Sequence, residues 1–227
     1  MRVTVVRHHE EDSAGFIGDA FESRGAVLTV HMFPKEGPLP APSGIDHVVL
    51  LGATWSVYDP GPERSWIAGE LDWLRRLDEA GVPVLGICFG AQALSAAFGG
   101  SVTPAARKEI GWTLVDTLDP AVVPPGPWLE FHGDQCHPPR EARLLARNEL
   151  GVQAFALRRH LAVQFHPEVD GPQLSRWLEA GGRAEAEKAG QDPDRFLAET
   201  VAAEPAARDR AYALVAAAIE LAARPAR

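Results

Sequence analysis

One stretch of the sequence decides the fold: Val82-Pro83-Val84-Leu85-Gly86-Ile87-Cys88-Phe89-Gly90-Ala91-Gln92. Residues 82–87 form a nearly continuous hydrophobic run, which is typical of a strand buried on both faces in a parallel sheet. Gly81 ends a helical pattern before this run, and a new helical pattern begins directly after Cys88. The stretch therefore predicts a buried parallel strand that turns at once into a helix.

Outside this stretch, short apolar runs alternate with helical patterns over about the first hundred residues. Strands are predicted at 3–6, 27–30 and 46–51. Helices are predicted between a cap at Asp12 or Ser13 and a stop at Gly25, and again over about 64–80. This alternation predicts an α/β domain: an open, mostly parallel sheet with helices on both faces, in flavodoxin-like layering.

The second half of the chain has a different texture. Residues 101–165 read as shorter strands separated by Pro- and Gly-rich turns. From about residue 170 the chain becomes helical and rich in alanine. Pro193 is expected to open a helix, and Pro205 to end it and open another that runs to about Ala223. We therefore expect one α/β domain over 1–178 and a helical extension over 179–227 that packs on it.

The composition excludes several classes of partner. The 227 residues carry 31 acidic and 22 basic side chains, a formal net charge of −9. Nucleic acid and anionic membranes both need a basic face, so neither is an expected partner. No apolar run approaches the roughly 18 residues of a membrane span, and no signal peptide is evident. The expected location is the cytoplasm, and the sequence indicates no cofactor and no metal.

Cys88 stands where a catalytic nucleophile would stand. Glycines two residues before and after it allow the tight strand-to-helix turn that lifts one side chain above the sheet edge. The helix N-terminus favours thiolate over thiol, and the N–H of Phe89 would point toward an oxyanion formed on a substrate. The alternative is a buried cysteine that packs as a small hydrophobe, which the flanking Gly86 and Gly90 make the weaker interpretation.

His166 and Glu168 supply the base and orienting group that such a nucleophile needs. An apolar strand ends in His166-Pro167-Glu168, and residues two apart on an extended chain point to the same side. Alone, this pattern is usually a surface ion pair. Together with the cysteine turn it favours a Cys88–His166–Glu168 triad.

Two other groups of reactive side chains invite a weaker interpretation. Cys136 precedes His137 in a Pro-rich loop, which offers too few ligands for zinc, so Cys136 is expected to be structural. The run 8–11, His-His-Glu-Glu, follows the first strand at the carboxyl edge of the sheet. It could line a pocket mouth, but a solvated turn is the expected role.

Three motifs in this order resemble the class I (triad-type) glutamine amidotransferase family. They are Gly86-Ile87-Cys88-Phe89-Gly90-Ala91-Gln92, His132-Gly133-Asp134 and Gln164-Phe165-His166-Pro167-Glu168. The run Leu51-Gly52-Ala53-Thr54-Trp55-Ser56-Val57-Tyr58-Asp59 resembles the oxyanion loop of the family, and Lys108-Glu109-Ile110-Gly111-Trp112 is also similar. The resemblance covers roughly residues 1–178.

The resemblance implies a role for each matching residue. Cys88 would attack the side-chain amide of glutamine to form a γ-glutamyl thioester, with His166 moving protons and Glu168 holding its imidazole. An oxyanion hole would be formed by Gly52, Ala53 and Phe89. The substrate would be bound by Gln92, His132 and Gly133. The family commonly has two glycines where this chain has Gly52-Ala53, and alanine tolerates positive φ poorly. One hypothesis is that this loop rearranges before it donates an N–H.

Three functional hypotheses remain open. The first is a glutaminase subunit that passes ammonia to a separate synthetase, as the resemblance to the amidotransferase half of GMP synthase suggests. The chain has no phosphate-binding Gly-Lys loop and no length for a synthetase domain. The second is a free-standing hydrolase or transferase for another γ-glutamyl amide or peptide. The third, a protein that only binds and regulates a partner, is the least favoured because the triad is intact.

Overall fold

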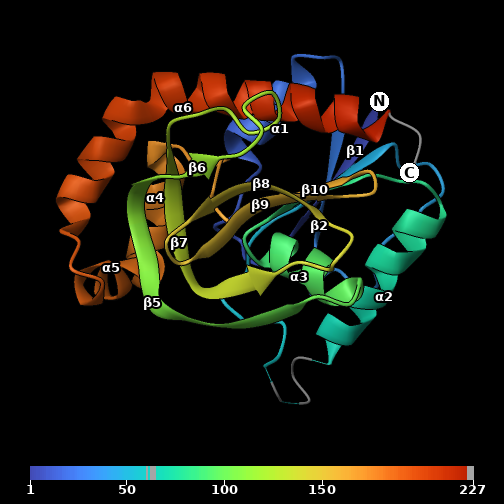
Figure 1. Ribbon diagram of the computed structural model, residues 1–227, viewed down its shortest axis with the longest axis horizontal. Coiled ribbons are helices and arrows are strands. Elements are labelled where there is room, and N and C mark those ends of the chain that lie inside the picture. Colours follow the sequence, from blue (N-terminus) through green and yellow to red (C-terminus); the bar gives the residue numbers. More distant parts are fainter. Residues whose placement is uncertain (60, 62–64, 224–227) are drawn as a thin grey trace.

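A single curled sheet organises the computed structural model, which describes residues 1–59, 61 and 65–223 (Figure 1). Its first half is parallel, in the order β2 (Val27–Met32), β1 (Arg2–Arg7), β3 (His47–Leu50), β4 (Val84–Ile87), β10 (His160–Val163). Its second half is antiparallel, in the order β9 (Gly151–Leu157), β7 (Pro127–His137), β5 (Ser101–Leu114). Two more strands continue from β9, namely β8 (Arg143–Asn148) and β6 (Asp116–Thr117). The predicted α/β class is confirmed, with a sheet of mixed direction.

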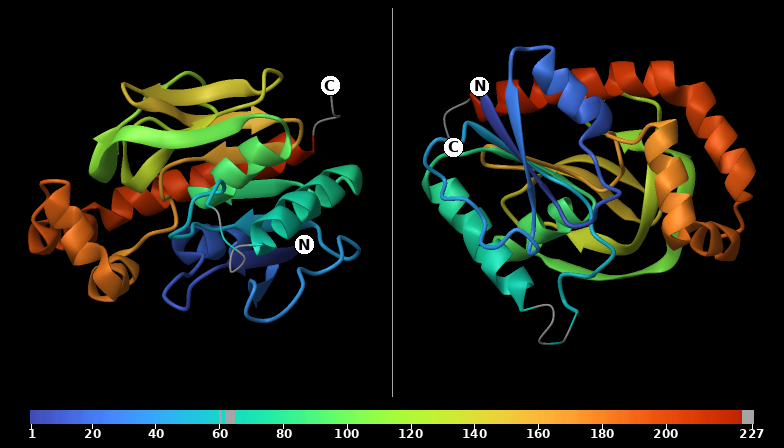
Figure 2. Two further views of the ribbon diagram at one scale, coloured as in Figure 1. Left: turned by 90° about the horizontal axis from the view of Figure 1, so that it is seen from below. Right: turned by 180° about the vertical axis from the view of Figure 1, so that it is seen from behind.

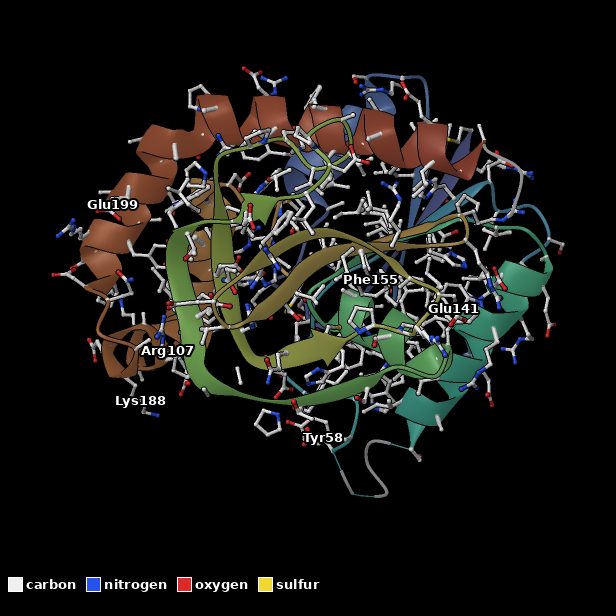
Figure 3. The ribbon with its side chains drawn as sticks, in the orientation of Figure 1. Tyr58, Arg107, Glu141, Phe155, Lys188 and Glu199 are labelled. Atoms are coloured by element: carbon white, nitrogen blue, oxygen red, sulfur yellow. The ribbon has the colours of Figure 1, made fainter. Side chains whose placement is uncertain are left out.

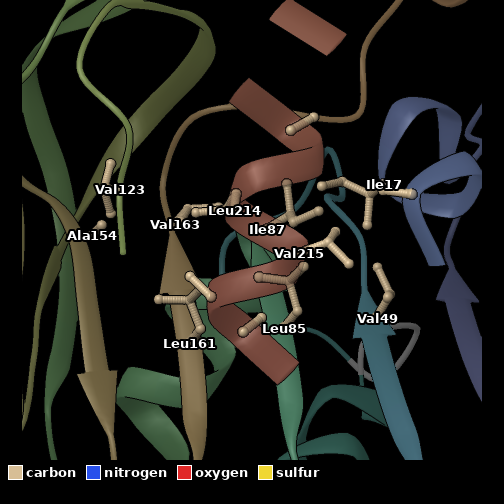
Figure 4. Close-up of a cluster of buried hydrophobic side chains, with 14 of the residues drawn as sticks. Ile17, Val49, Leu85, Ile87, Val123, Ala154, Leu161, Val163, Leu214 and Val215 are labelled. Carbon is tan, nitrogen blue, oxygen red and sulfur yellow. The ribbon is translucent and has the colours of Figure 1, made fainter. Parts of the chain in front are cut away.

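Helices cover both faces of the parallel half (Figure 2). One face carries α2 (Trp66–Glu79) and α3 (Phe89–Ala97), and the other carries α1 (Gly15–Glu22) and α6 (Pro193–Ala222). The strands alternate between the two layers: Leu85 and Ile87 of β4 face α6, whereas Val84 faces α2. Figure 4 shows Leu214 and Val215 of α6 lying over these strands. The near-continuous apolar run at 82–87 follows from this burial on both faces.

Predicted helix boundaries hold in part. The helix expected over 64–80 is α2, whose stop at Gly81 is as predicted, while residue 64 lies outside the described residues. Asp12 and Ser13 do not cap α1: the side chain of Asp12 accepts from Trp177, and Ser13 donates to Gln173. Both polar side chains form hydrogen bonds with residues of α4 instead of capping α1.

The predicted break at Pro205 is wrong, because α6 runs through it without interruption. Pro193 does open α6, with Asp192 as its cap. Proline inside a helix removes one backbone hydrogen bond and bends the axis, but burial of a long apolar stripe holds the helix together. Figure 1 shows α6 curving from α5 across the sheet.

The helices after residue 170 are joined to the antiparallel half by a separate apolar cluster. They are α4 (Gly171–Trp177), the wide turn η2 (Leu178–Gly182) and α5 (Arg183–Lys188). Leu178, Ala186 and Phe196 pack in this cluster with Ile110 of β5 and Leu129 of β7. The boundary expected at residue 178 stays a prediction.

Charged and apolar side chains separate as expected for a folded chain. Figure 3 shows Arg107, Lys188 and Glu199 projecting at the periphery, while Phe155 lies inside the sheet layers. Within the described ranges, no helix combines the length and apolar character needed to cross a membrane.

Candidate active site

Cys88 occupies the sharp turn between β4 and α3. It has φ 52° and ψ −108°, a conformation that L residues rarely adopt. A Cβ atom on Gly86 would lie 2.6 Å from the carbonyl oxygen of Gly90, and one on Gly90 would lie 2.2 Å from that of Leu50. Both glycines are therefore needed for the close approach of strand and helix. The turn puts the thiol at the N-terminus of α3, where the N–H of Phe89 has no intrahelical partner.

His166 and Glu168 lie beside Cys88, in the segment that follows β10. The Nδ1–H of His166 donates to Oε1 of Glu168 at 2.8 Å, and only 4% and 1% of the two side chains is exposed. A Cβ atom on Gly52 would lie 3.3 Å from Cε1 of His166 and 4.0 Å from Sγ of Cys88. The three positions therefore surround one point, and Nε2 of His166 has no hydrogen-bond partner among the described residues.

The charges around His166 favour its protonated form. Burial by itself lowers the pKa of His166, but the negative charges of Glu168 and Cys88 outweigh it and raise this pKa well above the ordinary value. An imidazole in this setting can take and hold the proton of the Cys88 thiol.

Trp177 and Asp12 form a wall of the site that the sequence motifs did not indicate. The ring of Trp177 meets that of His166 edge-on, with centroids 4.9 Å apart. Its Nε1–H donates to Oδ1 of Asp12 at 2.9 Å. Burial raises the pKa of Asp12, and the hydrogen bond from Trp177 opposes this shift in part. The two residues are 165 positions apart, so only the fold brings them together.

The loop expected to form the oxyanion hole is held from behind by a buried ion pair. His8 Nδ1–H donates to the carbonyl oxygen of Gly52 at 3.0 Å, and its Nε2 lies 3.2 Å from Oε1 of Glu70. A planar trans peptide points its N–H away from its C=O, so the N–H of Ala53 points away from His8. Only Cys88 and Arg158 among the described non-glycine residues have positive φ, so Ala53 fits this loop without backbone strain.

The expectation of a solvated turn at 8–11 is wrong for His8, whereas the half-buried His9 has the other role considered for this run, at the cavity. The side chain of His8 is fully buried, and His9 lines the cavity beside Cys88. The ring of His9 stacks on Trp55 with centroids 4.7 Å apart, and its Nε2 lies 3.0 Å from Oγ1 of Thr54. Trp55 thus gives the loop a ring on which His9 packs.

The far end of the same loop is tied to the segment that carries His132 and Gly133. The hydroxyl of Tyr58 donates to Oδ1 of Asp134 at 2.6 Å, and Ser56 donates to the other carboxylate oxygen. Burial, together with the Asp134 carboxylate, raises the pKa of Tyr58. This contact fixes the loop across one side of the cavity.

The remaining predicted residues line one cavity of about 830 Å³, which is in the usual size range of small-molecule sites. Nε2 of Gln92 donates to Oε1 of Gln164 at 3.2 Å, and Gln92 is buried. Nδ1–H of His132 donates to the carbonyl oxygen of Asp134 at 2.8 Å. The structure thus brings the following predicted residues to the cavity: Cys88, His166, Gly52, Ala53, Gln92, His132 and Gly133. Glu168 lies behind His166, and Phe89 begins α3 with a buried ring.

Comparison with known proteins agrees with this arrangement. The family model described as glutamine amidotransferase class-I matches residues 16–180. GMP synthase (glutamine-hydrolyzing) of Thermomicrobium roseum is 36% identical over 138 residues, 57% of this chain and 24% of that protein. The same enzyme of Aeropyrum pernix is 35% identical over 147 residues, 59% of this chain and 28% of that protein. The chain therefore spans about a quarter of the length of these curated relatives.

Solved structures match over nearly the whole chain. A glutamine amidotransferase from Thermotoga maritima is 28% identical, with a TM-score of 0.88 over 97% of this chain and 98% of that one. A glutamine amidotransferase from Methylobacillus flagellatus is 22% identical, with a TM-score of 0.87 over 100% of this chain and 97% of that one. The second likeness is one of fold alone.

Proposed function

The chain belongs to the class I glutamine amidotransferase family, and from that premise we propose that it hydrolyses glutamine at Cys88 through a γ-glutamyl thioester. One observation carries this proposal: His166 lies beside Cys88 on one side and is hydrogen-bonded to Glu168 on the other. The positive φ of Cys88, at a turn where both flanking glycines are required, supports its role as nucleophile.

The proposed reaction has two stages. In the first, Nε2 of His166 takes the thiol proton, and the sulfur of Cys88 attacks the amide carbon of the substrate side chain. The C–N bond breaks, the imidazolium gives its proton to the leaving nitrogen, and ammonia departs. In the second, His166 takes a proton from water, whose oxygen attacks the thioester; the C–S bond breaks, the thiol regains its proton and glutamate leaves.

Backbone amides would stabilise the negative oxygen formed in each stage. We assign the N–H of Phe89 and the loop at Gly52-Ala53 to this oxyanion hole. Gln92, one helical turn after Cys88, and the main chain at His132-Gly133 would bind the substrate. Their common cavity supports these assignments.

Ammonia would pass to a separate acceptor-activating polypeptide. The relative from Thermomicrobium roseum is named GMP synthase (glutamine-hydrolyzing), and this chain matches 24% of it, which supports a synthetase as the recipient of the ammonia. We also propose that 1–178 is the catalytic domain and that the helical extension at 179–227 packs on it. Contacts of Ala186 and Phe196 with the cluster around Leu129 support the packing of the extension on this domain.

A second candidate is hydrolysis of a larger γ-glutamyl amide or peptide with the same triad. The cavity of about 830 Å³ favours it, because glutamine alone would fill only part of this volume. Trp55, packed between His9 and Trp66, gives the cavity mouth an aromatic side that a larger leaving group could contact.

One set of assays separates these candidates. Glutamate release is followed from glutamine and from γ-glutamyl peptides, with the chain alone and with candidate synthetases, beside Cys88→Ala. Fast turnover of γ-glutamyl peptides without any partner would replace the first proposal by the second. A glutamine-mimicking diazoketone should label Cys88, located by mass spectrometry of the digested peptide. A label on another residue would overturn the nucleophile assignment.

A further inference from the structure

Three acidic and imidazole side chains meet outside the triad, and one of them, His132, lines the cavity that holds Cys88. Glu130 and His132 are two apart on β7 and share a face of that strand. The antiparallel register places Glu109 of β5 directly opposite His132. Exposed fractions of the three side chains are 7% for Glu109, 0% for Glu130 and 3% for His132. Sequence motifs contain Glu109 and His132 separately, and only the pairing of β5 with β7 brings these two residues together.

The donor atoms converge without bonding to one another. Nε2 of His132 lies 3.2 Å from Oε2 of Glu109 and 3.1 Å from Oε2 of Glu130. Yet neither Nε2 nor either oxygen of Glu130 has a hydrogen-bond partner among the described residues. The distances are therefore short enough for hydrogen bonds, but the angles at Nε2 of His132 fit neither carboxylate. A buried carboxylate with both oxygens unpartnered is costly, and a bound cation between these atoms would remove that cost.

Surrounding groups orient the set as metal ligands are usually oriented. Nδ1–H of His132 donates to the carbonyl oxygen of Asp134 at 2.8 Å, which leaves Nε2 facing the two carboxylates. Burial lowers the pKa of His132, but Glu109 and Glu130 raise it to about 10, so a metal ion at Nε2 must displace a proton. The amides of Asn148 and Gln153 donate to the two oxygens of Glu109 at 2.6 and 2.9 Å. These bonds fix the imidazole tautomer and the carboxylate plane.

We propose that Glu109, Glu130 and His132 bind one divalent cation of the Zn²⁺ class. Nε2 of His132 lies about 3 Å from each carboxylate, and all three ligand atoms lie within 4.8 Å of one another. Small shifts of these side chains would let them share an ion at about 2.1 Å from each, and one imidazole with two carboxylates is a donor set that zinc accepts. Two carboxylates balance the charge of the ion, so the bound site is neutral. Water from the cavity would complete its coordination.

The position of the site allows an ion to reach it. His132 lines the cavity that holds Cys88, and Glu109 lines a second cavity of about 470 Å³ on the other side. The neighbouring ammonium of Lys108 is turned away into an ion pair with Glu185. The ion has no step in the thioester reaction, and its site does not depend on the proposed function. Because it would adjoin the substrate cavity, bound zinc is expected to slow glutamine hydrolysis.

Zinc binding to the full-length Cys88→Ala chain tests the proposal, since this background removes the reactive thiolate. Titration calorimetry and equilibrium dialysis with Zn²⁺ should give one ion per chain. Adding Glu130→Gln should weaken binding at least about tenfold, whereas Glu149→Gln, an exposed carboxylate on the second cavity, should leave it unchanged. Co²⁺ in place of zinc should give visible bands without thiolate charge transfer.

Circular dichroism establishes that each variant is folded. Should Glu130→Gln fail to fold, Glu109→Gln in the same background carries the comparison, with the same expected loss. Two results would overturn the proposal: no stoichiometric Zn²⁺ binding at up to 100 times the protein concentration, or full affinity in a folded Glu variant.

Discussion

Two buried histidine–glutamate pairs flank the loop at Gly52, and they differ in what their second ring nitrogen does. His166 donates from Nδ1 to Glu168 at 2.8 Å, while its Nε2 has no hydrogen-bond partner among the described residues. His8 uses both nitrogens, one toward the carbonyl oxygen of Gly52 and one toward Glu70. Charge shifts both pKa values upward: burial lowers the pKa of His8, but the Glu70 carboxylate more than offsets it.

The contrast separates two uses of the same chemical pair. An imidazole with one free nitrogen at a cavity can exchange a proton with a reactant. One with both nitrogens engaged, packed against the rings of Trp66 and Phe89 at 5.3 and 5.2 Å, can only hold its neighbours in place. We therefore expect His166 to act in the chemistry and His8 to position the loop.

The largest effect is expected from replacing the two histidines in parallel. His166→Gln should lower kcat for glutamine hydrolysis by about 10⁴-fold or more, because it removes the proton carrier. His8→Gln should lower it by about tenfold at most, because the loop loses an anchor but the triad remains. Steady-state kinetics on both variants checks this. Comparable losses in the two variants would contradict the distinction between the two histidines. As a control, Cys136→Ala should retain activity, because burial raises the pKa of the Cys136 thiol to about 12.

The next effect concerns the carboxylates. Glu168→Gln should lower kcat by about 10³-fold, since the imidazolium formed during attack loses its counter-charge. Removing this charge also takes away one cause of the raised pKa of His166, so the pH profile of kcat/KM should change shape. Glu70→Gln should leave that profile where it is. A shifted profile in Glu70→Gln with an unshifted one in Glu168→Gln would reverse the two assignments.

Local sequence predicts one of the two histidine–glutamate pairs and not the other. His166 and Glu168 are two residues apart at the end of a strand, and the turn at Cys88 is written in its flanking glycines, so local geometry predicts both. Glu70 lies 62 positions from His8, and its polar side chain sits on the buried face of α2. Nothing local distinguishes it from a solvated helix residue.

The fold shows the same division. Hydrophobic periodicity predicted the parallel half and its covering helices, because strands buried on both faces leave a continuous apolar run. The prediction failed at Pro205, because a proline interrupts an isolated helix but not one held by packing. Beyond this proline, Ala211, Leu214 and Val215 are buried against the sheet and keep α6 continuous. Long-range contacts of this kind have no local sequence signal.

A stability prediction sharpens the positioning role of His8. Glu70→Gln should cost about 3 kcal/mol of unfolding free energy near pH 6, because it leaves a buried imidazole without its charge partner. The folded pKa of His8 is raised, so its contribution is complete below the unfolded value of 6.5 and is lost as pH rises through the folded value. The difference between the wild-type and variant chains should therefore shrink from pH 6 to pH 9 in urea unfolding. A difference that grows with pH would contradict the ion pair.

The smallest effect is expected at His47, a buried histidine without a carboxylate partner in the described part of the chain. Burial lowers the pKa of His47 to about 4, and its Nε2 has no partner among the described residues. A folded pKa below the unfolded one costs stability as pH falls through 6.5 toward 4, about 2 kcal/mol at pH 5. His47→Leu should remove this acid loss, so its unfolding free energy should fall less than that of the wild-type chain between pH 7 and pH 5.

The exposed His137 supplies the control, because His137→Leu removes a histidine side chain from the surface instead of from the core. If the unfolding free energy falls equally with pH in the wild-type chain and in His47→Leu, a partner of His47 must stabilise its protonated form in the folded chain. In that case burial alone would not set its charge, and His47 would belong with His8 and His166 as a histidine whose partner decides its protonation.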